Sequence, residues 1–268
     1  MDMPQYIKWF VEESSVAFED GKPVTCYKLA YEINDDIFNE WALHIRRHYE
    51  SDEELAESLS ATEMNAESYL REYVIPQKTD AFGPTSRSND FTEIMISDLL
   101  QFIHDYTVPR CKQDNRSGKA NSAHGTDILG YKYKNPTCKP HPEDELVAVE
   151  VKAGLSSDSY EPIHKAVVDS KKYDALRYAH TLNFYRKALN RKGQNQQADE
   201  IARFQKKSEN NFVLTFIAAA IVSRDSIPQN TINIKGEDLE LRCATKVFLV
   251  HGKQLMTLAH EIYERCIK

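Results

Sequence analysis

Long apolar runs in the second half of the chain predict the buried strands of a β-sheet. Residues 212–222 (FVLTFIAAAIV) are the longest such run, and residues 245–252 (TKVFLVHG) are rich in β-branched and aromatic side chains. The segment 144–154 (DELVAVEVKAG) has the same character, although Glu150 and Lys152 interrupt it. Because eleven residues are too few to cross a bilayer, the longest run is interpreted as a strand rather than a membrane span.

Segments with helical spacing alternate with these strands. Apolar side chains recur on one face of residues 89–109, which predicts a helix with Asn89 or Asp90 as its N-cap. Further helices are expected at 35–50, 161–192 (one or two), 198–210 and 253–267, and further strands at 24–33 and 125–134. From residue 90 onward the order is helix, strand, strand, helices, strand, strand, helix. That order predicts an α/β fold in which a mixed β-sheet is flanked by helices.

Charge is distributed unevenly along the 268 residues. The first 80 residues carry 18 acidic and 7 basic side chains, net −11, and the remainder carry 23 acidic and 27 basic, net +4. A polar stretch with Pro and Gly, 76–90, separates the two parts. We therefore expect a mostly helical acidic N-terminal region at 1–80 and a second domain at 85–268. The acidic region is either a solvated layer or, as we favour, a docking or DNA-mimicking regulatory surface.

Neither a secretory signal nor a zinc motif is evident. The N-terminus lacks a basic segment followed by an apolar one, so the cytoplasm is the expected compartment, without membrane association. The five cysteines are widely spaced and form no CxxC pair, which predicts reduced thiols and no structural zinc. His44 and His48 lie four residues apart without a third ligand beside them, which favours a solvated helix face.

The charges inside segment 144–154 need an explanation. Strand side chains alternate between faces, so Glu150 and Lys152 point the same way, while Val149 and Val151 point into the packing. Burying a lone carboxylate is costly unless it is paired or binds a metal. The two charges are therefore either an ordinary ion pair on a solvated strand face or part of a functional site.

Two further acidic residues favour a functional site. Asp127 follows the Gly125–Thr126 turn, and Glu93 lies in the first turns of the preceding predicted helix. With Glu150 they supply an oxygen-rich pocket that suits Mg²⁺, and Mn²⁺ is the expected substitute. Lys152 can orient a water and offset charge during phosphodiester hydrolysis. The simpler interpretations are a Glu93 favoured by the helix dipole and an Asp127 that stabilises a turn.

A basic stretch follows the predicted strand with Glu150. Residues 163–192 hold eight Lys and Arg against two Asp, and Lys165, Lys171 and Lys172 are candidates for contacts to DNA phosphates. His124, beside the glycine turn, is a further candidate for a contact to the scissile phosphate. The alternatives are a solvated helix face for the basic stretch and a surface position for the histidine.

These residues resemble the motif of the PD-(D/E)XK nuclease superfamily: a helix with Glu93, a strand after GTD, a VEVK strand and a basic helix. The superfamily's Pro before the first Asp is replaced by Thr126. More narrowly, residues 85–268 resemble the HamA nuclease family of the Hachiman anti-phage defence system. The resemblance implies a mixed sheet with Mg²⁺ bound at the strand ends. It also implies a separate superfamily-2 helicase partner that restrains the nuclease until foreign DNA is sensed.

Two functions follow from these observations. The first is a Mg²⁺-dependent DNA nuclease with little sequence preference, in which Glu93, Asp127 and Glu150 bind the metal and Lys152 serves the water and the transition state. The second is a catalytically inactive nuclease-like module that binds DNA or protein within a complex. Sequence-specific cleavage is less favoured because no separate base-reading motif is evident.

Overall fold

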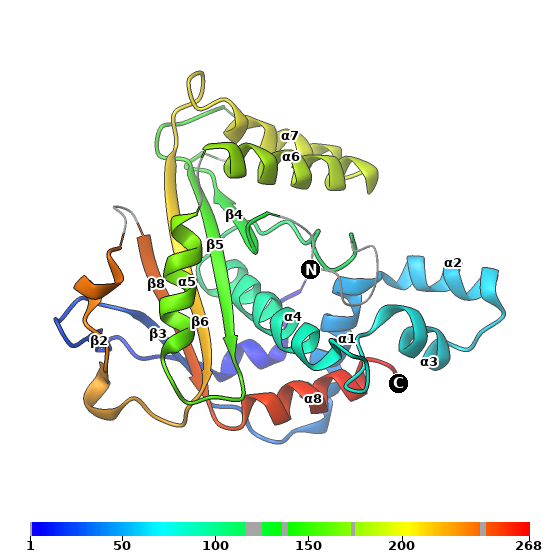
Figure 1. The fold of residues 1–268 in the computed structure, drawn as a ribbon. Coiled ribbons are helices and arrows are strands. Elements are labelled where there is room, and N and C mark those ends of the chain that lie inside the picture. The colour runs from blue at the N-terminus through cyan, green and yellow to red at the C-terminus, as the bar shows by residue number, and fades with distance from the viewer. Residues whose placement is uncertain (1, 116–124, 136–138, 173–174, 242–244) are drawn as a thin grey trace.

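The computed structural model of this chain describes residues 2–115, 125–135, 139–172, 175–241 and 245–268. Among these residues, no helix is both long enough and apolar enough to cross a membrane. Most of the described chain is helix or strand, and the six-stranded sheet lies at its centre (Figure 1).

The central sheet is mixed, as expected, and has the strand order β1-β3-β8-β6-β5-β4. The inner strands β3, β8, β6 and β5 are parallel to one another, whereas the outer strands β1 and β4 are each antiparallel to their neighbour. A separate parallel pair joins β2 to β7. The strands are β1 (Phe10–Glu12), β2 (Ala17–Phe18), β3 (Thr25–Leu29), β4 (Ile128–Lys132), β5 (Glu145–Gly154), β6 (Val213–Ser223), β7 (Thr231–Ile232) and β8 (Thr245–Gly252).

Helices cover both faces of the sheet (Figure 1). The predicted helices in the basic stretch and at the end of the chain are present, which confirms an α/β fold with a flanked mixed sheet. The α-helices are α1 (Asp35–Tyr49), α2 (Asp52–Thr62), α3 (Ala66–Tyr69), α4 (Gly83–Asp98), α5 (Glu161–Lys171), α6 (Ala175–Arg191), α7 (Asn195–Ala202) and α8 (Leu255–Arg265).

Strand β6 shows why the sheet requires cover on both sides. Ile217, Ala219 and Ile221 belong to the core that contains residues of α1, α4 and α8. Ala218 and Ala220 point the opposite way, into a second core shared with α5. A strand buried on both faces reads as a continuous apolar run, which is the pattern that made this segment recognisable in the sequence.

Helix α4 begins earlier than the sequence pattern suggested. It starts at Gly83 after Phe82, with Pro84 in its first turn, so neither Asn89 nor Asp90 is its N-cap. Its polar first half hid the true start. Consequently Glu93 lies in the middle of the helix rather than in its first turns, where the helix dipole would have favoured it. The dipole explanation for Glu93 is therefore wrong.

The acidic N-terminal part contributes to the same sheet as the rest of the chain. Strand β3 pairs with β8 and strand β1 pairs with β3. Strands from both sides of the expected boundary at 76–90 therefore belong to one sheet. This N-terminal part contains strands as well as the helices α1, α2 and α3. Ser51 and Glu54 form a capping box at the start of α2. The regulatory role of this part stays a prediction.

A buried polar network joins α1 to α4 and corrects the interpretation of His44 and His48. Both histidines are buried rather than solvated. Asp98, itself fully buried, accepts hydrogen bonds from Tyr6 and His44 Nε2, and from Arg110 at 2.7 Å. His44 therefore faces the core because its acidic partner Asp98 lies on another helix, about fifty residues further along the sequence. His48 beside it is bonded to the His44 carbonyl oxygen and to Arg110.

His48 in this network gives stability a measurable pH dependence. Burial, together with the charge of Arg110, lowers the pKa of His48 from 6.5 to about 3. The folded protein therefore keeps this histidine neutral, while the unfolded chain takes up a proton below about pH 6.5. The stability contributed by His48 is complete above that pH and is lost as the pH falls toward 3.

We expect the stability difference between wild type and His48→Gln to shrink by about 1.4 kcal/mol between about pH 7.5 and about pH 5.5. The measurement is urea unfolding of both proteins at the two pH values. The variant is the matched control, since all other titrating groups are shared. A difference that stays constant with pH would show that His48 is not held neutral.

Candidate active site

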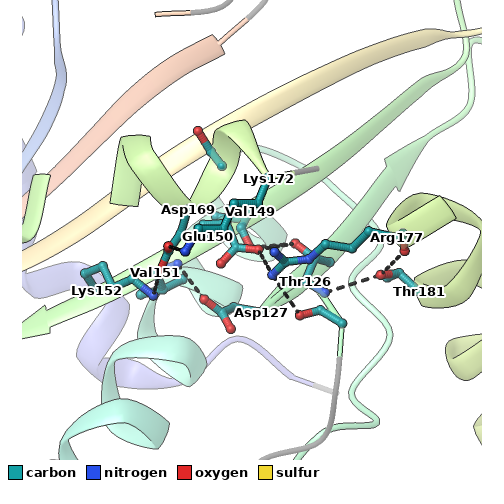
Figure 2. Close-up of polar contacts among 12 residues, drawn as sticks. Thr126, Asp127, Val149, Glu150, Val151, Lys152, Asp169, Lys172, Arg177 and Thr181 are labelled. Atoms are coloured by element: carbon teal, nitrogen blue, oxygen red, sulfur yellow. Dashed lines mark hydrogen bonds and ion pairs between the residues drawn. The ribbon is translucent and has the colours of Figure 1, made fainter. Parts of the chain in front are cut away.

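Glu150 is buried just past the middle of β5 and is held by two neighbours. Its Oε1 accepts a hydrogen bond from Arg177 at 2.9 Å and another from the Thr126 hydroxyl at 3.4 Å. Arg177 reaches this carboxylate from α6, as Figure 2 shows. Val149 and Val151, on either side, belong to the core on the α4 face, so Glu150 points to the opposite face as strand alternation requires.

The environment of Glu150 disfavours its negative charge. Burial, and then the nearby Asp127 carboxylate, raise the pKa of Glu150 to about 7, although Arg177, Lys152 and Lys112 act in the opposite direction. A cation placed between the two carboxylates would favour the charged form of both. A carboxyl group with this perturbation, beside other charged groups, is typical of a functional site.

Asp127 is positioned beside Glu150 by the turn that precedes β4. Gly125 has φ +119°, a conformation that side chains rarely adopt, and a Cβ there would meet the Thr181 hydroxyl at 3.1 Å. After this turn, Asp127 Oδ2 accepts a hydrogen bond from the Val151 backbone N–H at 2.8 Å. Asp127 is therefore fixed against β5, next to the backbone that carries Glu150.

Lys112 connects Asp127 with Glu93. Its ammonium lies 3.2 Å from Asp127 Oδ1 and 3.6 Å from Glu93 Oε2, and the lysine is buried. Burial alone would lower the pKa of Lys112, but Glu93 and Asp127 outweigh it and raise the pKa above the usual value. Gln113 also donates to Glu93 Oε2 at 3.3 Å. The two carboxylates thus surround a buried positive charge.

The structure therefore brings the three predicted metal ligands into one charged cluster, although not into closed coordination. Among the described residues, Glu93, Asp127 and Glu150 are not a group whose ligand atoms all lie within 4.8 Å of one another. The position of the Lys112 ammonium nevertheless shows that a cation is stabilised between two of these carboxylates. An all-oxygen donor set around a point that already accommodates positive charge fits Mg²⁺.

Lys152 lies beside this cluster and is paired with α5. Its ammonium is 2.6 Å from Asp169, which also pairs with Lys172 at 2.6 Å, and Figure 2 shows these side chains meeting. Burial by itself lowers the pKa of Lys152, but the hydrogen bond with Asp169 and the charge of Asp127 raise it overall. Lys152 is therefore held as a cation near the acidic cluster.

The candidate phosphate contacts lie in different places. Lys172 adjoins the site through Asp169, whereas Lys165 pairs with Glu161 and Lys171 pairs with Glu240. His124 lies outside the residues that the structure describes. Of the four, the structure therefore places Lys172 beside Lys152, and the DNA-binding role of the set stays a prediction.

Sequence reasoning did not identify four neighbours of the site: Thr126, Lys112, Asp169 and Arg177. Thr126 was visible only as the residue replacing the usual Pro. Lys112 lies in a polar segment after Pro109 with no periodicity, and Arg177 and Asp169 were counted only within a basic stretch. The need for opposite charges beside Glu150 and Lys152 was the one signal that could have indicated these neighbours. That signal does not say where in the sequence the opposite charges lie.

The fold and this cluster define a class: a mixed α/β protein in which acidic residues and lysines meet beside the ends of neighbouring strands. The family model HamA matches residues 4–266, nearly the whole chain. The chain therefore belongs to the HamA family, the family of the Hachiman subunit, and this membership supports a role in anti-phage defence. A search among curated proteins found no match.

Proposed function

We propose that this protein is a Mg²⁺-dependent DNA nuclease of the PD-(D/E)XK type and the effector of an anti-phage defence complex. The observation that supports this most strongly is that Glu93 and Asp127 share the buried Lys112 ammonium, while Glu150, paired with Arg177, lies beside Asp127 on the strand that also carries Lys152. Keeping several carboxylates and lysines together in a buried strand environment costs stability, which a purely structural role does not explain.

In this proposal, Glu93, Asp127 and Glu150 hold Mg²⁺. When bound, the ion supplies charge neutralisation at the phosphate and polarises the scissile bond. Lys152 donates a hydrogen bond to the attacking water or to a phosphate oxygen and offsets the charge that develops there. Asp169 orients Lys152, because its carboxylate lies 2.6 Å from the lysine ammonium. Lys172, which also pairs with Asp169, would contact the adjacent phosphate.

A partner is part of the proposal. Family membership supports a complex, and the proposed partner is a superfamily-2 helicase that controls access of DNA to the site. Within the chain, Arg177 is bound to Glu150 and Lys112 to both Glu93 and Asp127. This pairing also favours a second candidate function, a metal-free module that binds DNA or protein without cleavage. The two functions differ in whether cleavage requires metal.

Cleavage of supercoiled plasmid by the purified chain separates these functions. Wild type is incubated with Mg²⁺ or with EDTA, beside the Glu150→Ala/Lys152→Ala double variant. Metal-dependent nicking by wild type alone supports the nuclease. If wild type is inactive, the assay is repeated with the helicase partner and ATP, and continued inactivity supports the binding module. Equal cleavage by both proteins would contradict the proposed site.

Replacement of Lys112 tests whether the metal competes with its ammonium. We expect Lys112→Met to lower the Mg²⁺ concentration for half-maximal cleavage by roughly tenfold, about 1.4 kcal/mol in binding free energy. The reason is that Mg²⁺ no longer has to displace a cation held by Glu93 and Asp127. Without metal, the variant should unfold at a lower temperature, since the buried Glu93 and the partly buried Asp127 lose their counter-charge.

Lys132→Met is the matched control for this test. Lys132 is a half-buried lysine at the end of β4 that lies over the Tyr106 ring, away from the carboxylates. Its replacement should leave the Mg²⁺ requirement unchanged. A Lys112→Met variant with an unchanged Mg²⁺ requirement would show that the metal does not occupy the space between Glu93 and Asp127.

A further inference from the structure

We propose that the opposite edge of the sheet holds a second metal site, of the zinc type, formed by Glu13, Cys26 and His251. Cys26 lies in β3, His251 lies in β8, and Glu13 directly follows β1. Because β1, β3 and β8 are adjacent in the sheet, the three side chains come from neighbouring strands. Strand β6 separates this edge from β5, which carries the candidate nuclease site.

The donor atoms are already close to the spacing that zinc requires. One oxygen of Glu13 lies 2.8 Å from His251 Nε2 and 3.8 Å from Cys26 Sγ, and all three donor atoms lie within 4.8 Å of one another. In a tetrahedral zinc site, sulfur, nitrogen and oxygen ligands are separated by roughly 3.3–3.5 Å. A shift of the Glu13 carboxylate by less than an ångström would therefore bring its distances to His251 and Cys26 to the spacing of zinc ligands.

The hydrogen bonding of His251 points the correct nitrogen at the site. His251 Nδ1 lies 2.9 Å from the Arg224 carbonyl oxygen, which can only accept, so this nitrogen carries the proton. Its Nε2 is therefore the nitrogen that faces the Glu13 carboxylate, 2.8 Å away, and His251 is fully buried. In the metal-free protein this contact is a hydrogen bond, and a metal ion bound between the two atoms would replace its proton. A histidine whose second nitrogen donates to a carbonyl is typical of metal ligation.

The sheet holds these ligands in place before any metal binds. The Glu13 backbone N–H donates to the Cys26 carbonyl at 2.9 Å, which fixes the carboxylate beside the thiol. Cys26 and His251 are on strands paired in parallel, with Cys26 opposite Leu249. A surface cavity of about 540 Å³, lined by residues that include Glu13 and Cys26, adjoins the site. This cavity gives a metal ion an entry path and leaves space for water as a fourth ligand.

The donor types select a zinc-like ion over Mg²⁺. Thiolate and imidazole are ligands that Zn²⁺ binds well and Mg²⁺ binds poorly. Burial and the Glu13 carboxylate raise the pKa of the Cys26 thiol, so the metal-free thiol is protonated and Zn²⁺ binding releases that proton. The ligands are residues 13, 26 and 251, far apart in the sequence, which explains why a search for short cysteine motifs predicts no zinc.

Cobalt spectroscopy on the full chain tests this site directly. After removal of metals with a chelator, wild type is titrated with Co²⁺, and Zn²⁺ is then added as a competitor. We expect one equivalent of Co²⁺ with a thiolate-to-cobalt charge-transfer band in the near ultraviolet, which Zn²⁺ removes. Cys26→Ala should lose this band and weaken Zn²⁺ binding at least about tenfold. The Glu150→Ala/Lys152→Ala variant should retain both, which separates this site from the candidate nuclease site.

Cys111→Ala is the matched control, because Cys111 is equally buried but lies in the core under α6. It should keep the charge-transfer band and the Zn²⁺ affinity. Thermal unfolding with and without Zn²⁺ covers the case in which Cys26→Ala folds poorly: Zn²⁺ should raise the Tm of wild type and of Cys111→Ala. A wild-type spectrum without the thiolate band, or a band retained in Cys26→Ala, would overturn the proposal.

Discussion

Replacing Glu150 with Gln is expected to reduce metal-dependent DNA cleavage by about 10²–10³-fold. Gln keeps the size of the side chain and can still accept a hydrogen bond from Arg177, which lies 2.9 Å from Glu150 in the wild type. It cannot supply the negative charge that a bound cation requires. The effect should therefore appear in the rate of cleavage and in the Mg²⁺ requirement, with little effect on folding, since Glu150 is destabilised as an anion.

Glu145→Gln is the control for this prediction. Glu145 begins the same strand and accepts a hydrogen bond from Tyr106 at 2.7 Å, so the substitution removes a carboxylate from β5 without touching the site. Plasmid cleavage is measured for both variants over a range of Mg²⁺ concentrations. If Glu150→Gln cleaved as fast as Glu145→Gln, Glu150 would not be a metal ligand and the proposed chemistry would be wrong.

Replacing Asp98 with Ala is expected to destabilise the fold by about 3–5 kcal/mol. Asp98 is fully buried and is the shared acceptor for Tyr6, His44 and Arg110. Interaction with Arg110 and His44 outweighs the effect of burial and lowers the pKa of Asp98 well below its usual value. Without the carboxylate, the Arg110 guanidinium stays largely buried without its counter-charge, and three segments of the chain lose their common partner.

Urea unfolding of Asp98→Ala beside Tyr6→Phe measures this effect. Tyr6→Phe removes one hydrogen bond to the same carboxylate but leaves every charge paired, so it should cost only about 1 kcal/mol. The contrast between the two variants isolates the unpaired charge from the lost hydrogen bond. A similar, small effect for both would indicate that water or a neighbouring group replaces Asp98 as the counter-charge.

The central strands β6 and β8 were predictable from the sequence because burial on both faces leaves a continuous apolar run. Residues 212–222 and 245–252 correspond to β6 and β8 within a residue or two. The start of α4 was not predictable, since its first turns contain Pro84 and a series of polar residues that resemble a linker. A local sequence pattern carries no information about the tertiary contacts that keep such a segment helical.

The residues of the candidate site were predictable only in part. Glu150 and Lys152 stand out because a charge inside an apolar strand is costly, and Asp127 stands out because it follows a glycine turn. Lys112 and Arg177 carry no such signal: each is one lysine or arginine among many until the fold places it beside a carboxylate. The same reason hid the burial of His48, whose environment is made by a distant helix and by Arg110.

The place of β8 between β3 and β6 has a consequence for synthesis of the protein on the ribosome. Strand β3 (Thr25–Leu29) emerges well before its parallel partner β8 (Thr245–Gly252), because the whole segment between them must be made first. Until β8 inserts, β3 and β6 each present an unpaired edge, and the β1–β3 pair cannot join the rest of the sheet. Such long-range pairing makes folding slow, and the sheet stays incomplete until β8 has been made. A cell making this proposed nuclease thus has an interval in which a chaperone or the partner subunit can engage it before the sheet is complete.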